Sequence, residues 1–167
     1  MKLRTLPILA LLLAVLAGCT PASSSVPTGA TGTAKMSITA TNLVGKLDQL
    51  KEAKRSIFPS DGVFMPESEV QFTEGESAFD ILERETRARK LHLEFENTPV
   101  YNTAYVEGIG NLYELDAGPL SGWMYRVNGE FPNFGSSKYV LKDGDVVEWV
   151  YTLDLGKDFD TAVGRQQ

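Results

Sequence analysis

Hydrophobic and polar residues alternate along two stretches near the end of the chain, 121–128 and 146–153. Successive side chains of a strand point to opposite sides, so each stretch predicts a strand with one apolar face. The residues that share these faces are Trp123, Tyr125 and Val127 in the first stretch and Val147, Trp149 and Tyr151 in the second. The pair Asn128-Gly129, which tolerates positive φ, closes the first strand with a tight turn.

One amphipathic helix is predicted over residues 77–89. Ser77 is a suitable N-cap, and Asp80 follows three residues later, as in a capping box. An apolar stripe and a basic last turn support the helix, since cations stabilise the carboxyl end of a helix. The stripe consists of Ala78, Phe79, Leu82 and Thr86.

The remaining patterns predict further strands and one short helix. Leucines at helical spacing between Leu43 and Leu50 indicate a short amphipathic helix or helical turn. Alternation also predicts strands at 36–41, 68–73, 91–96 and 105–115, the last interrupted by two glycines. The central sheet is expected to contain the strands near 36–41, 91–96, 122–128 and 146–153, with the helix across one face.

The first 18 residues predict a signal peptide rather than part of the domain. A short basic region precedes the apolar run from Leu6 to Ala17, which is too short for a mature transmembrane helix. The sequence Leu16-Ala17-Gly18-Cys19 resembles a bacterial lipobox, and this resemblance implies lipidation of Cys19. Cys19 is the only cysteine, so it has no intramolecular disulfide partner. The alternative is an ordinary signal peptide with a stray cysteine.

Composition divides the rest of the chain into a linker, a domain and a tail. Residues 19–34 are rich in Ser, Thr, Gly and Pro and lack charge, so a lipidated N-terminus and flexible tether are expected. The domain is expected at 35–160, followed by a polar tail at 161–167. Lipidation would anchor the protein to the extracellular face of the bacterial cell membrane.

The net charge argues against one class of partner. Loss of Lys2 and Arg4 with the signal peptide leaves 14 basic and 22 acidic side chains, a formal charge of −8. An acidic domain repels nucleic acid, so no nucleic-acid partner is expected.

A family resemblance covers nearly everything from Met36 to Asp158. The segments that carry it include GWMYRVNGEFPNFG, YVLKDGDVVEWVYT and EGESAFDILERETRARKLHLEF. They resemble a bacterial domain family of unknown function related to the C-terminal domain of transcobalamin. The resemblance implies an α+β fold with a β-grasp-like mixed sheet and one packed helix. It also implies ligand binding, with a corrinoid as the ligand class, and it places Trp123 and the loop after it in the matching hairpin region.

The residues themselves predict no catalytic site, and the protein is expected not to be an enzyme. His92 is the only histidine, and the domain has no cysteine, so Cys-His chemistry and the usual zinc sites are excluded. Carboxylates at Asp154, Asp158 and Asp160 are weak candidates for calcium, because their spacing does not match an EF-hand. A solvated tail is the simpler interpretation of these three residues.

Clustered aromatic residues are the better candidate for a binding site. The predicted ligand-binding residues are Trp123, Tyr125, Phe131, Asn133 and Phe134. Rings on a loop suit a planar or apolar ligand, and the amide of Asn133 would add polar contacts. The alternative is that Trp123 and Tyr125 fill the core and that both phenylalanines fold back over it.

The leading functional prediction is therefore a non-enzymatic, surface-tethered module that binds a corrinoid or a similar small molecule. No cofactor is expected beyond this ligand. A second hypothesis is an interaction module, in which the same aromatic loop docks a surface partner protein or a cell-wall polymer. A calcium-binding surface protein is a third and weaker alternative.

Overall fold

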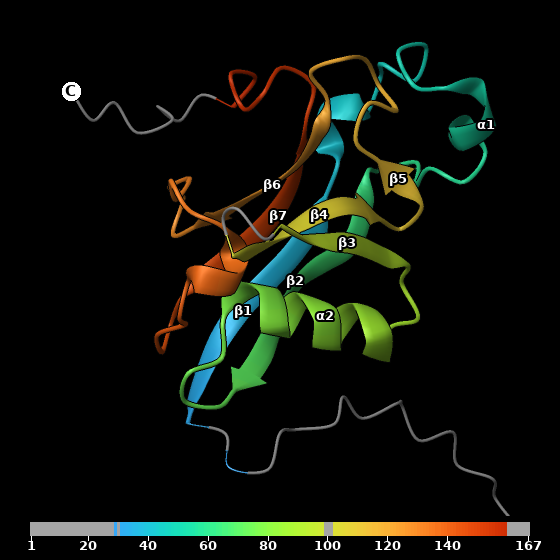
Figure 1. Cartoon of the computed structure of the whole chain (residues 1–167). Helices are drawn as coiled ribbons and strands as arrows, with labels where there is room; N and C mark the ends of the chain where they lie inside the picture. Colours follow the sequence, from blue (N-terminus) through green and yellow to red (C-terminus); the bar gives the residue numbers. More distant parts are fainter. Residues whose placement is uncertain (1–28, 30, 99–101, 160–167) are drawn as a thin grey trace, which may run out of the picture.

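Two β-sheets and one long helix make up the part of the chain that the computed structural model describes, residues 29, 31–98 and 102–159 (Figure 1). The elements in this part are β1 (Gly32–Thr39), η1 (Thr41–Leu43), α1 (Glu52–Arg55), β2 (Val63–Phe72), α2 (Ala78–Ala88), β3 (Leu93–Thr98), β4 (Thr103–Ile109), β5 (Leu112–Tyr113), β6 (Gly122–Val127), η2 (Ser136–Lys138) and β7 (Val146–Thr152). The fold is α+β and dominated by its sheets, as predicted.

The larger sheet has four strands in the order β2-β1-β7-β6. It is mixed, because β1 and β7 pair in parallel at its centre while both outer pairs are antiparallel. Trp123 lies opposite Tyr151, and Tyr125 lies opposite Trp149. These four rings are buried on one face, so the alternation in the sequence correctly predicted both strands and their inner side.

The smaller sheet has three strands in the order β3-β4-β5 and corrects one prediction. The strand expected near 91–96 exists as β3, but it pairs with β4 rather than joining the central sheet. The outer place beside β1 belongs to β2, which starts at Val63 instead of near residue 68. The alternation of hydrophobic and polar residues indicates which face of a strand is buried, but it does not indicate which strand lies beside it.

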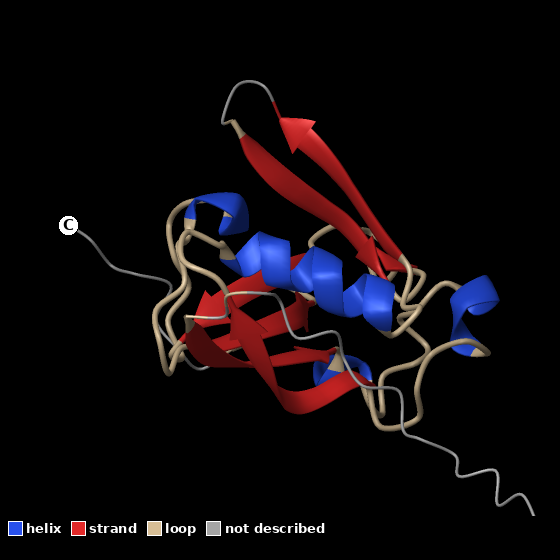
Figure 2. Ribbon diagram, turned by 90° about the horizontal axis from the view of Figure 1, so that it is seen from below, coloured by secondary structure: helices blue, strands red, loops and turns tan. Residues whose placement is uncertain are grey.

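Helix α2 was predicted correctly in its position and in its capping. The Ser77 side chain accepts a hydrogen bond from the Asp80 amide, and the Asp80 carboxylate accepts one from the Ser77 amide. Phe79, Ile81 and Leu82 are buried. Viewed from below, α2 lies between the four-stranded sheet and the β3–β4 pair (Figure 2).

The short helix or helical turn predicted between Leu43 and Leu50 is largely a series of turns, followed by the single turn α1. The helical elements nearest to this segment are η1, which ends at Leu43, and α1, which starts at Glu52. Gly45 has a φ of +79°, which is incompatible with a continuous right-handed helix. Leu43 and Leu50 are nevertheless buried, because consecutive turns bring them to the core at a spacing similar to that of a helix.

Strand β1 begins at Gly32, inside the last residues of the predicted linker. Its first residues pair with the end of β2, and Ala34 is buried. The predicted signal peptide, Cys19 and the tail 161–167 lie outside the described residues. Within the described ranges, none of the helices is long and apolar enough to cross a membrane.

Candidate functional site

The aromatic residues predicted as a binding site divide into a buried group and an exposed one. Trp123 belongs to the buried group and is 9% exposed. Its indole N–H donates to the Leu112 carbonyl at 2.8 Å. Its ring packs edge-on against Tyr151 at 5.3 Å and Phe64 at 5.8 Å between centroids. Trp123 therefore connects the two sheets from within the core.

Tyr125 lies in the core but reaches the loop that follows β6. Its ring packs against that of Trp149 at 5.6 Å. Its hydroxyl donates to the backbone carbonyl of Phe134 at 2.7 Å. Burial, and to a smaller degree the nearby Tyr139, raises the pKa of Tyr125, so the hydroxyl stays protonated as a donor. A residue on the buried face of β6 is thus hydrogen-bonded directly to the loop that follows this strand.

Phe131 is also buried, although the sequence places it in the same loop as Phe134. Its ring contacts that of Phe159 at 5.7 Å, and the Arg126 guanidinium lies 5.9 Å from the Phe159 ring. The segment after β7 therefore folds back and covers Phe131. Sequence reading missed this contact because residues 154–160 show no hydrophobic periodicity.

Asn133 and Phe134 line an open groove of about 430 Å³, which we call the loop groove. Its walls come from the β6–β7 connection and from the start of β4; the lining residues are Thr103, Pro132, Asn133, Phe134, Gly135 and Lys138. Phe134 is 48% exposed, and its ring stacks on that of Tyr139 at 6.2 Å with an angle of 12° between the planes. Trp123, Tyr125 and Phe131 do not line the loop groove, because their rings pack in the interior.

The loop is fixed to β4 by close contacts with Thr103. A Cβ at Gly135 would lie 1.8 Å from the Thr103 Oγ1, so only glycine fits there without a shift. The Ser137 hydroxyl lies 2.9 Å from that of Thr103 and accepts a hydrogen bond from the Ala104 amide at 3.1 Å. The groove is therefore preorganised, which reduces the entropy lost when a ligand binds.

Tyr139 lies behind the exposed ring of Phe134 and packs against it. Burial raises the pKa of its hydroxyl, and the Asp145 carboxylate raises it further through its charge and a hydrogen bond. The Tyr139 carbonyl also accepts from the Ala78 amide at 2.9 Å, which joins the loop to the first residue of α2.

The groove combines three kinds of contact that a small ligand can use. Phe134 offers a stacking surface, Lys138 an exposed ammonium group and Asn133 an exposed amide. Sequence analysis missed Thr103 and Lys138. Thr103 is far from the loop in the chain, and one exposed lysine carries no sequence signal of its own.

The two described acidic residues that were proposed for calcium, Asp154 and Asp158, have partners within the protein. Asp158 accepts hydrogen bonds from the Thr152 hydroxyl, from the Leu153 amide at 2.8 Å and from the Asn42 amide group at 2.9 Å. Burial alone would raise the pKa of Asp158, but these hydrogen bonds together lower it below its usual value. Asp154 lies 3.7 Å from the Lys157 ammonium, and Asp160 is outside the described residues. No three His, Cys, Asp or Glu residues in the described ranges are grouped to hold a metal ion.

Comparison with known proteins gives one family and two structural similarities. Residues 75–152, slightly less than half of the chain, match the family described as a domain of unknown function, DUF4430. Haptocorrin in complex with Cbi has a similar fold, with a TM-score of 0.53 and 13% identity. A candidate metal binding protein from Ruminococcus gnavus matches with a TM-score of 0.46 and 14% identity. No curated protein matches the chain.

The extents of these matches differ. Both similarities cover 72% of this chain, but they cover 25% of haptocorrin and 96% of the Ruminococcus gnavus protein. The chain thus spans about a quarter of the length of haptocorrin. The match to haptocorrin supports a transcobalamin-like fold, in agreement with the resemblance in the sequence.

Proposed function

We propose that this protein is a non-enzymatic binding module that holds a small molecule in the loop groove. The observation that carries the proposal is the half-exposed ring of Phe134, which stacks on Tyr139 beside Lys138 and Asn133. An exposed aromatic ring held in place by hydrogen bonds from the core is suited to stacking on a planar ligand.

A corrinoid is the ligand class that we propose. The resemblance to the transcobalamin C-terminal domain and the fold shared with haptocorrin, whose structure is a complex with Cbi, support this class. We also infer a β-grasp-like arrangement, because β1 and β7 pair in parallel at the centre of the sheet, with α2 against one face. Since the chain spans only a quarter of haptocorrin, the loop groove would form one side of the ligand's surroundings.

Lipid attachment at Cys19 is part of the proposal. A lipidated N-terminus followed by the uncharged linker would tether the domain to the extracellular face of the cell membrane. Mass spectrometry of the processed N-terminus tests this step. An unmodified Cys19 thiol, or cleavage at another position, would refute the lipid anchor without affecting the binding proposal.

Titration of the purified full-length protein with cobalamin tests the binding function. Tryptophan fluorescence and the melting temperature are followed, and calcium is titrated separately. At about a hundred times its dissociation constant, a ligand stabilises the fold by about 2.7 kcal/mol, a shift of several degrees. Phe134→Ala should remove this shift while the unliganded melting temperature stays nearly unchanged.

Val140→Ala provides the matched control. Val140 is 55% exposed in the same connection but does not line the groove, so its truncation should preserve the ligand-induced shift. A shift that survives Phe134→Ala would place the ligand elsewhere. No response to cobalamin would favour the interaction-module hypothesis, and a response to calcium alone would favour the metal-binding one.

A further inference from the structure

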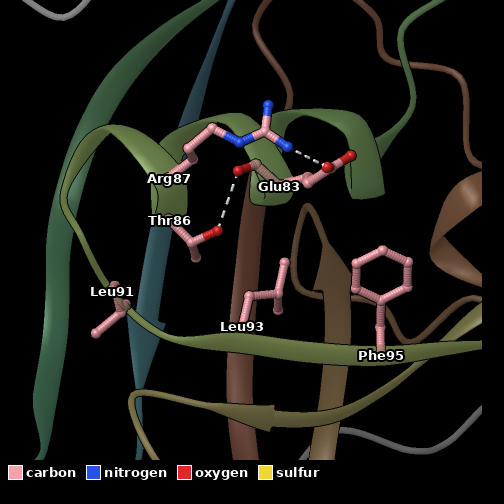
Figure 3. Close-up of a pocket in the computed structure, with 6 residues that line it drawn as sticks. All are labelled: Glu83, Thr86, Arg87, Leu91, Leu93 and Phe95. Atoms are coloured by element: carbon pink, nitrogen blue, oxygen red, sulfur yellow. Dashed lines mark hydrogen bonds and ion pairs between the residues drawn. The ribbon is translucent and has the colours of Figure 1, made fainter.

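The three-stranded sheet packs one face against α2 and exposes the other. Figure 3 shows the side chains of Leu93 and Phe95 pointing from β3 toward α2. Because side chains alternate along a strand, Glu94 and Glu96 lie on the opposite face, and both are exposed. Tyr105 of β4 pairs with Glu96 and is 47% exposed, so the outer face of this sheet is open to solvent.

Two tyrosines and four glutamates make up this outer face, which we call the Tyr–Glu face: Glu94, Glu96, Tyr105, Glu107, Tyr113 and Glu114. The strands β3, β4 and β5 contain no lysine, arginine or histidine. None of the four glutamates forms an ion pair within the described residues. Their negative charge therefore has no direct partner.

Hydrogen bonds join residues of the face into two pairs of a tyrosine and a glutamate. The Tyr113 hydroxyl donates to the Glu94 carboxylate at 2.6 Å, and the Tyr105 hydroxyl donates to the Glu114 carboxylate. The Tyr113 ring also lies close over Gly108, where a Cβ would come within 2.8 Å of the ring. Both rings are therefore held on the sheet, each beside a carboxylate.

Carboxylates dominate the electrostatics of the Tyr–Glu face. Burial, the hydrogen bond to Glu114 and the charges of Glu114 and Glu107 raise the pKa of Tyr105 to about 12. The hydrogen bond to Glu94, followed by burial and the charges of nearby carboxylates, raises the pKa of Tyr113 to about 12 as well. Burial and carboxylates cause both shifts, and no cation is among their causes. The electrostatic field at both hydroxyls is therefore negative.

Basic side chains on the neighbouring segments do not pair with this face. These segments carry Lys51, Lys54, Arg87, Arg89, Lys90 and Lys138. Lys51 and Lys54 pair with the buried Asp116, and the two arginines pair with glutamates of α2, the helix on the inner face. Lys90 and Lys138 form no ion pair in the described part of the chain. The four glutamates of the face are thus available to cations of another molecule.

One contact within the chain shows how a cation is held on this face. The Lys54 ammonium lies 4.5 Å from the centroid of the Tyr113 ring, within the range of a cation–π interaction. It also lies 3.7 Å from the Asp116 carboxylate. Tyr105 likewise has a carboxylate bonded to its hydroxyl, but no cation of the described residues lies over its ring. A cationic side chain of another protein would find at Tyr105 the kind of contact that Lys54 makes at Tyr113.

We propose that the Tyr–Glu face docks an arginine-rich segment of a partner protein. An arginine of the segment places its guanidinium over the Tyr105 ring and pairs with Glu96, which lies opposite Tyr105 on β3. Arginine suits this surface better than lysine, because its planar guanidinium stacks on a ring and bonds a carboxylate at the same time. The Tyr–Glu face shares no residue with the loop groove, so this site is independent of the ligand proposed there.

Three fluorescein-labelled octapeptides test the proposal by fluorescence anisotropy with the purified full-length protein. The arginine peptide RTRGRTRG should bind, the lysine peptide KTKGKTKG should bind at least about threefold more weakly, and ETEGETEG should not bind measurably. Glu96→Lys should weaken binding of the arginine peptide at least about fivefold. Glu74→Lys makes the same change in net charge at an exposed residue before α2, and it should weaken binding less than about twofold.

Two substitutions of Tyr105 separate the contribution of its ring from that of its hydroxyl. Tyr105→Leu removes the aromatic face and should weaken the arginine peptide about two- to fivefold, whereas Tyr105→Phe keeps the ring and should bind nearly as the parent does. All four variants change exposed side chains, so their melting temperatures should stay near that of the parent. No binding of the arginine peptide up to about 1 mM would overturn the proposal. Equal binding of the three peptides, equal effects of Glu96→Lys and Glu74→Lys, or equal effects of the two Tyr105 substitutions would also overturn it.

Discussion

The hydroxyl of Tyr125 donates a hydrogen bond of 2.7 Å to the backbone carbonyl of Phe134, and this bond links a core residue to the exposed wall of the loop groove. Tyr125→Phe removes the donor and keeps the ring that packs on Trp149. We expect a loss of about 1 kcal/mol in the free energy of unfolding, measured with urea. The loop amides around Phe134 should exchange faster, while those of β7 should not.

The tight contact between Gly135 and Thr103 predicts that the loop does not tolerate a side chain there. Gly135→Ala would force the loop away from β4, because the new Cβ would lie 1.8 Å from the Thr103 Oγ1. We expect a loss of about 1–3 kcal/mol in the free energy of unfolding, measured by urea denaturation. Gly122→Ala is the control, since its Cβ would lie 3.6 Å from the nearest atom, an ordinary contact. Equal effects of the two substitutions would contradict the steric explanation.

Phe131 and Phe134 should respond very differently to truncation. Phe131 is 8% exposed and packs against Phe159, so Phe131→Ala should lower the free energy of unfolding by about 3 kcal/mol. Phe134 is 48% exposed, and Phe134→Ala should lower it by less than about 1 kcal/mol. Thermal unfolding of the two variants and the parent, measured without ligand, compares these losses in stability. A large loss for Phe134→Ala would mean that its ring serves the fold rather than a ligand.

Asp158 should make the stability depend on pH in the acidic range. Its folded pKa is lowered, so its contribution is present above the unfolded pKa of about 3.9 and is lost as the pH falls through the folded value. Asp158→Asn should therefore be less stable than the parent near neutral pH, with a difference that shrinks on acidification. Urea unfolding at several pH values measures this difference.

Asp154→Asn is the control for this experiment. The Asp154 carboxylate is 46% exposed and pairs only loosely with Lys157, so the substitution should change stability little at any pH. A difference for Asp158→Asn that stays constant or grows toward low pH would show that the charge of Asp158 does not stabilise the fold.

The strands that alternate most clearly were predictable from the sequence, but their partners were not. Trp123 and Tyr151 were assigned to apolar faces because side-chain direction follows from the strand itself. Strand β1 is paired with β2 on one side and with β7 on the other, so it offers no free edge to β3. That choice is made by contacts between distant segments, which a local pattern does not contain.

The candidate site was predictable only in part for a similar reason. The turn-forming Pro132-Asn133 and the clustered rings indicated a loop with aromatic residues, and two of its members line a groove. Phe131 and Phe134 look alike in sequence, and what separates them is Phe159, which lies in a segment without periodicity. Asp158 fixes that segment through Asn42 and Thr152, so the burial of Phe131 is decided by residues at both ends of the domain.

The parallel pairing of β1 with β7 has a consequence for how the chain acquires its structure. The Thr33 amide bonds the Asp143 carboxylate across 110 residues of sequence, and β7 adds the remaining partners of β1. The centre of the sheet therefore closes only after almost the whole domain has been synthesised. Closing so long a loop slows folding, and a nascent chain that ends before β7 leaves one side of β1 unpaired and open to aggregation. The chain is therefore most prone to aggregation during synthesis, until its last strand, β7, has been made and has paired with β1.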